Sequence, residues 1–182
     1  MLPVKPIEAD LEQILAGSRD GDRLAQRQLY ERFHRSVYAL AVRLTGRSEA
    51  ADLTQEIFLR VFRSLESFRG NAQFSTWLYR VAVNECLRHR HTTRYPADPL
   101  TFEPAAREQA PGRRLELADL LEHALERLEP SLRAVFLLRH SEGLDYKQIS
   151  AVLEIPISTA ATRLARARAE LQRLLKGVVQ GS

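Results

Sequence analysis

The sequence predicts an all-α protein with two small helical domains joined by a flexible linker, and three observations lead to this fold class. Apolar residues recur at three- and four-residue steps on both sides of the chain's centre. Period-two runs of Val and Ile, which would indicate strands, are absent from the sequence. Four of the eight prolines lie between residues 92 and 112, where helical periodicity stops. We therefore expect a first domain at 8–91, an extended linker at 92–113 and a second domain at 114–178.

A long amphipathic helix opens the first domain, after a shorter helix around Leu11 to Leu15. Asp22 is a suitable N-cap because its side chain can accept a hydrogen bond from a free backbone amide, and Gly46 is a suitable C-cap. Between these two residues the apolar positions repeat with the helical period: Leu29, Phe33, Val37, Leu40, Ala41 and Leu44.

Two further helices complete the first domain. Ser48 is expected to cap the second helix. Its apolar stripe comprises Leu53, Ile57, Val61 and Leu65, flanked by Phe58 and Phe62. After a polar loop at residues 67–74, Ser75 is expected to cap a third helix that runs from Thr76 to about Arg90. The apolar stripes predict that these helices pack on each other.

The second domain begins with two helices, at residues 115–128 and at Pro130–Leu138. Pro130 suits the first turn of a helix, where no partner for its missing amide is needed, and Gly143 indicates a turn after the second helix.

A helix-turn-helix follows, and it is the most specific local pattern in the chain. Asp145 and Gln148 have the spacing of a capping box, which predicts a short helix at Tyr146–Leu153. A tight turn is expected at Glu154–Pro156, and Ser158 is expected to cap a last helix that continues to Lys176.

Composition and charge limit the possible compartments and partners. The 27 Lys and Arg residues outnumber the 23 Asp and Glu residues, and this formal charge of +4 permits a polyanionic partner. Cys86 is the only cysteine, so no intramolecular disulfide can form, and a reducing compartment such as the cytoplasm is the simplest interpretation. Residues 1–10 lack the pattern of a signal peptide, and no apolar run is long enough to insert in a membrane.

The last helix combines a polar, basic face with an apolar one. Thr159, Thr162, Arg163 and Arg166 share one face. The opposite face is apolar and consists of Ala160, Leu164, Ala167, Leu171 and Leu174. Basic faces are usually only solvated surface, but behind a complete helix-turn-helix this one indicates binding in a DNA major groove.

A polar group on the second helix predicts a protein interface. Asp52, Gln55 and Glu56 lie together, with Arg60 one turn further on. Paired carboxylates can act as an acid and a base, but these project from an exposed face with no candidate nucleophile or pocket nearby. We therefore expect no enzymatic activity from them and favour docking of a partner.

Aromatic, amide and cationic residues alternate over the loop and the third helix, as in proteins that bind single strands by stacking and backbone attraction. They are Phe68, Arg69, Asn71, Gln73, Phe74, Trp77, Tyr79 and Arg80. Phe74 and Trp77 are expected in the core instead, because a small three-helix domain needs large apolar residues. The outward residues of the third helix, among them Asn84 and Arg88, remain available for nucleic acid.

The sequence supports neither a metal site nor a cofactor site. Cys86, His89 and His91 invite a zinc hypothesis, but His91 lies on another helical face and no fourth ligand is apparent. We expect Cys86 to be a buried structural thiol. The sequence also lacks a glycine-rich phosphate loop, a dinucleotide fingerprint and a metalloprotease helix, so we expect no cofactor and no catalytic residues.

Several segments together resemble one protein family. The segments Asp52-Leu-Thr-Gln-Glu-Ile-Phe-Leu-Arg60, Phe68-Arg-Gly and Phe74-Ser-Thr-Trp-Leu-Tyr-Arg80 resemble region 2 of the extracytoplasmic-function sigma factors, which form group IV of the sigma-70 family. The segments Tyr146-Lys-Gln-Ile-Ser150 and Arg163-Leu-Ala-Arg-Ala-Arg168 resemble region 4 of the same family. The two resemblances cover nearly all of the chain outside the linker.

The resemblance implies three binding sites. The site for core RNA polymerase would comprise Asp52, Gln55, Glu56 and Arg60. The site for the melted minus-10 promoter strand would comprise Arg69, Asn71, Gln73, Ser75, Thr76, Tyr79, Arg80, Asn84 and Arg88. The site for the duplex minus-35 element would comprise Ser158, Thr159, Thr162, Arg163, Arg166 and Arg168. The linker would thread through the polymerase.

The resemblance also implies partners and a function. The partners would be core polymerase, through the clamp helices of its largest subunit and through its flap, then promoter DNA and an anti-sigma factor. The chain would direct transcription initiation at specific promoters. Two alternatives remain open from the sequence: a stand-alone helix-turn-helix regulator, and an interaction protein such as an adaptor.

Overall fold

Every element in the described part of the chain is helical, as the sequence predicts. The computed structural model describes residues 6–70, 72–94 and 117–179. The first helices are α1 (Pro6–Arg19), α2 (Arg23–Thr45), α3 (Arg47–Ser64), the 3-10 turn η1 (Leu65–Ser67) and α4 (Phe74–Arg94). They are followed by α5 (Leu117–Arg127), α6 (Pro130–His140), α7 (Tyr146–Leu153) and α8 (Ile157–Val179). No helix among these residues is long and apolar enough to cross a membrane.

The helix α2 is the centre of the first domain, and α1, α3 and α4 all pack against it. The Asp22 carboxylate accepts a hydrogen bond from the Leu24 amide at 2.9 Å, so this predicted N-cap is confirmed. Gly46 ends the helix with a φ of 103°, a conformation that L side chains rarely adopt, and its amide donates to the Val42 carbonyl at 2.9 Å. The predicted apolar faces of α2 and α3 are largely buried in the shared core.

Three predicted serine caps are wrong, because each helix begins earlier than expected. Gly46 both ends α2 and precedes α3, which places Ser48 inside the first turn. The helix α4 begins at Phe74 and α8 at Ile157, so Ser75 and Ser158 also lie within first turns. At the start of α8, the Ala160 amide already donates to the Pro156 carbonyl at 3.0 Å.

The helix-turn-helix forms as predicted in the second domain. The Gln148 amide donates to the Asp145 carboxylate at 2.7 Å, and the Asp145 amide donates to the Gln148 side chain at 2.9 Å, which completes the capping box. Glu154 then adopts a left-handed conformation with a φ of 53°, and this reverses the chain between α7 and α8. Behind the motif, α5 and α6 pack against α8.

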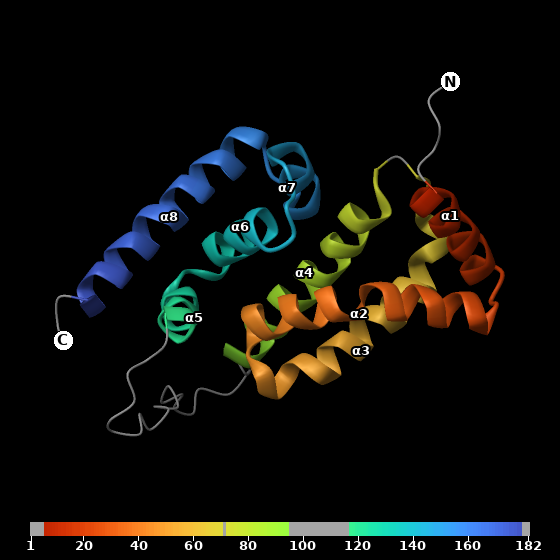
Figure 1. Ribbon diagram of the computed structural model, residues 1–182, viewed down its shortest axis with the longest axis horizontal. Coiled ribbons are helices and arrows are strands. Elements are labelled where there is room, and N and C mark those ends of the chain that lie inside the picture. Colours follow the sequence, from red (N-terminus) through yellow and green to blue (C-terminus); the bar gives the residue numbers. More distant parts are fainter. Residues whose placement is uncertain (1–5, 71, 95–116, 180–182) are drawn as a thin grey trace.

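The two domains pack on each other, which the sequence did not predict. The helix α7 lies along α4, and α5 and α6 contact α2 (Figure 1). Buried apolar residues of both domains form one continuous cluster. The helix α4 continues to Arg94, and the rest of the expected linker, residues 95–113, lies outside the described residues.

Candidate nucleic-acid interface

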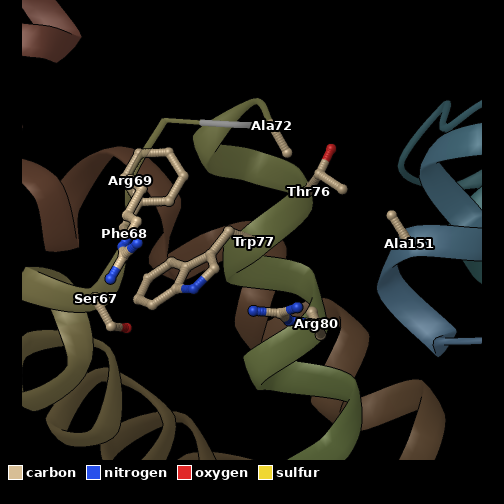
Figure 2. A pocket seen from close by; sticks show the side chains of 8 residues that line it. All are labelled: Ser67, Phe68, Arg69, Ala72, Thr76, Trp77, Arg80 and Ala151. Atoms are coloured by element: carbon tan, nitrogen blue, oxygen red, sulfur yellow. The ribbon is translucent and has the colours of Figure 1, made fainter.

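A pocket of about 220 Å³ opens between the loop after η1, the first turns of α4, and α7. Figure 2 shows side chains of α4 and of the loop on one side and α7 on the other. The lining residues are Ser67, Phe68, Arg69, Ala72, Thr76, Trp77, Arg80 and Ala151. Most of these come from the segment in which the sequence predicts single-strand binding.

Two aromatic rings, Phe68 and Trp77, form the apolar wall of this pocket, and both pack against Phe74. The Phe68 and Phe74 centroids lie 5.5 Å apart, and the Trp77 ring lies 5.5 Å from Phe68 and 5.7 Å from Phe74. All three side chains are buried, so the predicted core role of Phe74 and Trp77 is confirmed. Phe68 and Trp77 nevertheless line the pocket as well. Phe68 and Trp77 therefore stabilise the domain and also give the pocket an apolar surface.

Cationic and polar side chains surround the aromatic wall. Arg69 is exposed at the loop, and the side chain of Arg80 keeps 41% of its surface exposed. Thr76 is buried between α4 and α7 but still reaches the pocket. An aromatic wall with two guanidinium groups at its edge suits an unstacked base whose backbone phosphate carries negative charge.

The second domain covers part of this pocket. The Gln148 side chain of α7 donates to the Gln73 side-chain oxygen at 3.0 Å. Arg80 and Glu154 form an ion pair with 3.6 Å between nitrogen and oxygen, and Ala151 closes the pocket opposite Thr76. Residues predicted to meet DNA are thus engaged by the other domain in this arrangement.

Tyr79 lies apart from the pocket, although the resemblance places it in the minus-10 site. Its side chain is buried, and its hydroxyl interacts with the Glu142 carboxylate in the loop after α6. Burial, with a contribution from Glu142, raises the pKa of Tyr79. Burial also raises the pKa of Glu142, while Tyr79 and Arg43 act in the opposite direction. In this arrangement Tyr79 belongs to the contact between the domains.

The other predicted minus-10 residues spread along α4. Ser75 is half-buried and Asn84 is exposed. Arg88 is exposed too, and its guanidinium pairs with the buried Glu85 carboxylate. Asn71 lies outside the described residues.

The predicted polymerase-binding face is open on α3. Asp52, Gln55 and Glu56 are all exposed, whereas Arg60 extends towards α4 and contacts Glu85 at 2.9 Å. Beside them lies Leu59, an apolar side chain with 54% of its surface exposed, which the sequence reasoning missed. Leu59 lies four residues after Gln55, and this spacing places the two side chains on the same helical face.

The helix α8 shows the predicted division into two faces. Ala160, Leu164, Ala167 and Leu171 are buried against the domain core, and Leu174 is half-buried, so the apolar face is confirmed. On the other face, Ser158, Thr162 and Arg166 are exposed and Thr159 and Arg163 are half-buried.

Arg168 lies away from the other predicted minus-35 residues. Nine residues after Thr159, at 100° per residue, it lies on the opposite side of the helix. Its guanidinium is 3.3 Å from the His140 ring at the end of α6. Burial, Arg168 and Arg139 together lower the pKa of His140.

The described residues offer no set of metal ligands. No group of three or more His, Cys, Asp or Glu side chains is close enough to hold an ion in this part of the chain. Cys86 is fully buried, as the sequence predicts, and burial raises its pKa to about 12. The side chain of His91 lies outside those that are described.

Comparison with known proteins matches both domains to one family. Residues 29–94 match the family described as Sigma-70 region 2, and residues 118–171 match Sigma-70, region 4. The chain is 32% identical to the ECF RNA polymerase sigma-E factor of Haemophilus influenzae, covering 87% of this chain and 91% of that protein. It is 29% identical to the RNA polymerase sigma-H factor of Pseudomonas aeruginosa, covering 93% and 95% of the two chains.

Two solved structures have a similar fold. CnrH in complex with the cytosolic domain of CnrY has a TM-score of 0.69 and 27% identity, covering 90% of this chain and 96% of that one. The sigma factor RpoE in complex with the anti-sigma factor NepR, from Bartonella quintana, has a TM-score of 0.67 and 27% identity, covering 82% and 96% of the two chains.

A helical domain that matches Sigma-70 region 2 and a helix-turn-helix domain that matches Sigma-70, region 4 in one chain define the class of sigma-70-type initiation factors. Within this class, the chain belongs to the extracytoplasmic-function sigma factors. It is a non-enzymatic subunit that binds core RNA polymerase and directs transcription initiation at promoters.

Proposed function

We propose that the pocket at the start of α4 receives an unpaired base of the minus-10 strand. This proposal depends on one observation: Phe68, Trp77 and Arg80 line the same cavity. An aromatic wall stabilises a base that has left its stack, and the guanidinium attracts the neighbouring phosphate. Arg69, Gln73, Ser75 and Thr76 then surround the strand, whereas Asn84 and Arg88 extend the contact along α4.

The exposed face of α8 is proposed to read the minus-35 element as duplex. Thr159, Thr162, Arg163 and Arg166 lie in the first turns of the helix, the part that reaches base edges when a recognition helix enters the major groove. Arginine can donate two hydrogen bonds to one guanine edge, which gives sequence selectivity. Arg168 lies on the other side of the helix, so we leave it out of this site.

The α3 face is proposed to dock on the clamp helices of the polymerase. Asp52, Gln55 and Glu56 provide a polar rim around the exposed Leu59. An apolar centre inside a polar rim is the usual anatomy of a protein interface.

We also propose that an anti-sigma factor regulates this chain in the cytoplasm. The two solved structures with a similar fold are both complexes, one with the anti-sigma factor NepR and one with the cytosolic domain of CnrY. Both likenesses extend over more than four fifths of this chain, so they include both domains. We therefore propose that a protein of this kind binds the closed arrangement and holds the promoter-binding faces together.

The decisive experiment for the pocket uses the chain bound to core polymerase. Arg80→Ala should weaken binding of a fluorescent minus-10 single-stranded oligonucleotide about tenfold, because a charge-assisted contact and a cation–π contribution are lost. Arg27→Ala, which removes an exposed arginine from α2, is the matched control. Unchanged strand binding by Arg80→Ala, with start-site-specific transcripts still produced, would show that the pocket is not the strand site.

A further inference from the structure

The helix α1 precedes the segment that matches Sigma-70 region 2, which begins at residue 29. Its last turn nevertheless reaches the loop that forms the pocket. The Arg19 guanidinium donates to the Phe68 carbonyl at 2.8 Å and to the Leu65 carbonyl at 3.4 Å. It also lies over the Phe68 ring, with 5.8 Å between the guanidinium carbon and the ring centroid. One side chain therefore contacts both the backbone and the ring of the loop's first residue.

The helix α1 is packed firmly against the first domain. Ile14 and Leu15 are buried in the core of the first domain. A Cβ added to Gly17 would lie 2.9 Å from the Cβ of Ala25, so α1 and α2 approach more closely here than a side chain at position 17 would allow. The Asp22 amide also donates to the Gly17 carbonyl at 2.9 Å. Arg19 thus extends from a support that is anchored to the central helix.

The loop that Arg19 holds lies between two hollows. A second hollow of about 410 Å³ is lined by Glu12, Leu15, Arg19, Phe68, Arg69 and Gly70. Phe68 and Arg69 line this hollow and the proposed strand pocket alike, so they form a thin wall between the two. The wall is held in two ways: the Phe68 ring packs against Phe74 and Trp77, and the backbone is held by hydrogen bonds that include those from Arg19. The bonds from Arg19 are therefore well placed to set its position.

We propose that Arg19 is a positioning residue for the minus-10 strand pocket, holding Phe68 and Arg69 at the pocket's edge from outside the region 2 segment. This inference rests on the proposed function of the pocket. The planar guanidinium carries several N–H groups in a fixed fork, so it can reach two carbonyls at once, whereas a lysine ammonium is a compact point charge. The positioning requires an arginine at this place and not simply a positive charge.

The test compares Arg19→Gln and Arg19→Lys with Arg27→Gln. Arg27 is a suitable control because it is exposed and pairs only locally, with Glu31 one turn along α2, at 2.8 Å. Trp77 is the only tryptophan of the chain and its ring lies 5.5 Å from Phe68, so its fluorescence reports the loop directly. Acrylamide quenching of Trp77 in the full-length protein should increase about twofold in Arg19→Gln and stay unchanged in Arg27→Gln, because quenching follows solvent access to the ring.

Binding measurements with core polymerase provide the functional readout. Arg19→Gln should weaken binding of the minus-10 oligonucleotide about tenfold, since hydrogen bonds to a charged donor are lost. Its affinity for core polymerase and for a minus-35 duplex should match that of the wild type. Arg19→Lys should show nearly the same loss, and circular dichroism of both variants would verify that the helices have folded.

The outcomes separate this inference from the proposal on which it rests. If Arg80→Ala weakens strand binding and Arg19→Gln does not, the positioning role is overturned and the pocket remains. If neither variant affects strand binding, the pocket itself is the wrong site. Full recovery in Arg19→Lys would also overturn the positioning role, because charge alone would then suffice, as in direct contact with a phosphate.

Discussion

Glu85 links two residues that the sequence assigned to different partners. Its side chain is only 3% exposed, and its two oxygens pair with Arg60 of α3 and with Arg88 of α4. Arg60 was predicted on the polymerase-binding face and Arg88 on the strand-binding face. A buried carboxylate is stable only when opposite charge or hydrogen bonds compensate it, so the two arginines share this task.

We predict a non-additive loss of stability when both arginines are removed. Arg60→Ala and Arg88→Ala should each cost about 1 kcal/mol or less, because the remaining arginine still compensates Glu85. The double variant should cost about 3 kcal/mol or more, because the buried charge is then left without these two partners. Urea unfolding followed by circular dichroism measures all three free energies.

The control is a triple variant that adds Glu85→Gln to Arg60→Ala and Arg88→Ala. It should recover part of the loss, because a neutral amide costs less to bury than a carboxylate. Strictly additive single and double variants would contradict the shared role of the arginines.

A second prediction at the scale of one residue concerns Cys86. Burial excludes reagents from the thiol and raises its pKa to about 12, so at pH 8 only about one molecule in ten thousand carries the reactive thiolate. Iodoacetamide should therefore label native protein very slowly at pH 8. Labelling should be rapid in concentrated urea, where the thiol regains its ordinary pKa. Mass spectrometry measures the labelling rate in each condition. Equal rates would show that Cys86 is accessible in the folded protein.

At the scale of one element, α8 carries exposed arginines at different distances from its first turn. Arg166 and Arg173 are both exposed and lie on the same side, seven residues and therefore about 10 Å apart along the axis. Only the first turns of a recognition helix reach base edges in the major groove. The two arginines should consequently differ in function although their charge and exposure are alike.

We predict that Arg166→Ala lowers minus-35-dependent transcription about tenfold or more, as expected for loss of a contact worth about 1–3 kcal/mol. Arg173→Ala should lower it much less. Transcription in vitro with core polymerase, on promoters with an intact and a scrambled minus-35 element, measures the effect. Equal losses in both variants would indicate a general charge effect instead of base recognition.

At the scale of the whole molecule, polar contacts join the two domains around the apolar cluster. Arg43 of α2 pairs with Glu122 of α5 at 3.2 Å, and Arg80 of α4 pairs with Glu154 after α7 at 3.6 Å. Because Ala151 of α7 lines the proposed strand pocket, an oligonucleotide bound there would compete with the second domain for the same surface. The closed arrangement should therefore weaken strand binding by the free protein.

We predict that reversing two charges opens the molecule. In Glu122→Arg/Glu154→Arg, both ion pairs become repulsive, so the radius of gyration measured by small-angle X-ray scattering should increase. The free variant should also bind the minus-10 oligonucleotide more tightly than the wild type.

The double variant Glu122→Gln/Glu154→Gln is the matched control for charge reversal. It removes the attraction without adding repulsion, so its effects should be smaller, since exposed ion pairs contribute only about 1 kcal/mol or less. An unchanged radius of gyration in the reversed variant would mean that the apolar contact alone keeps the domains together. Salt should weaken the effect of charge reversal by screening it.

The sequence by itself determined the helices, their main apolar faces and the helix-turn-helix. These features depend on residues three or four positions apart, such as Asp145 and Gln148, so they can be read along the chain. It also placed most of the candidate strand site, because one short segment supplies Phe68, Trp77 and Arg80. The serine caps were wrong because several nearby residues can begin a helix equally well.

Only the tertiary structure decided which of these faces meet. It brought Arg19 to Phe68, 49 residues away, and Gln148 to Gln73, 75 residues away, and it buried Glu85 between two arginines. An apolar or polar stripe shows that a helix has a partner without specifying which one. That choice depends on the packing of the whole core, in which residues distant in the sequence must fit together at close contact.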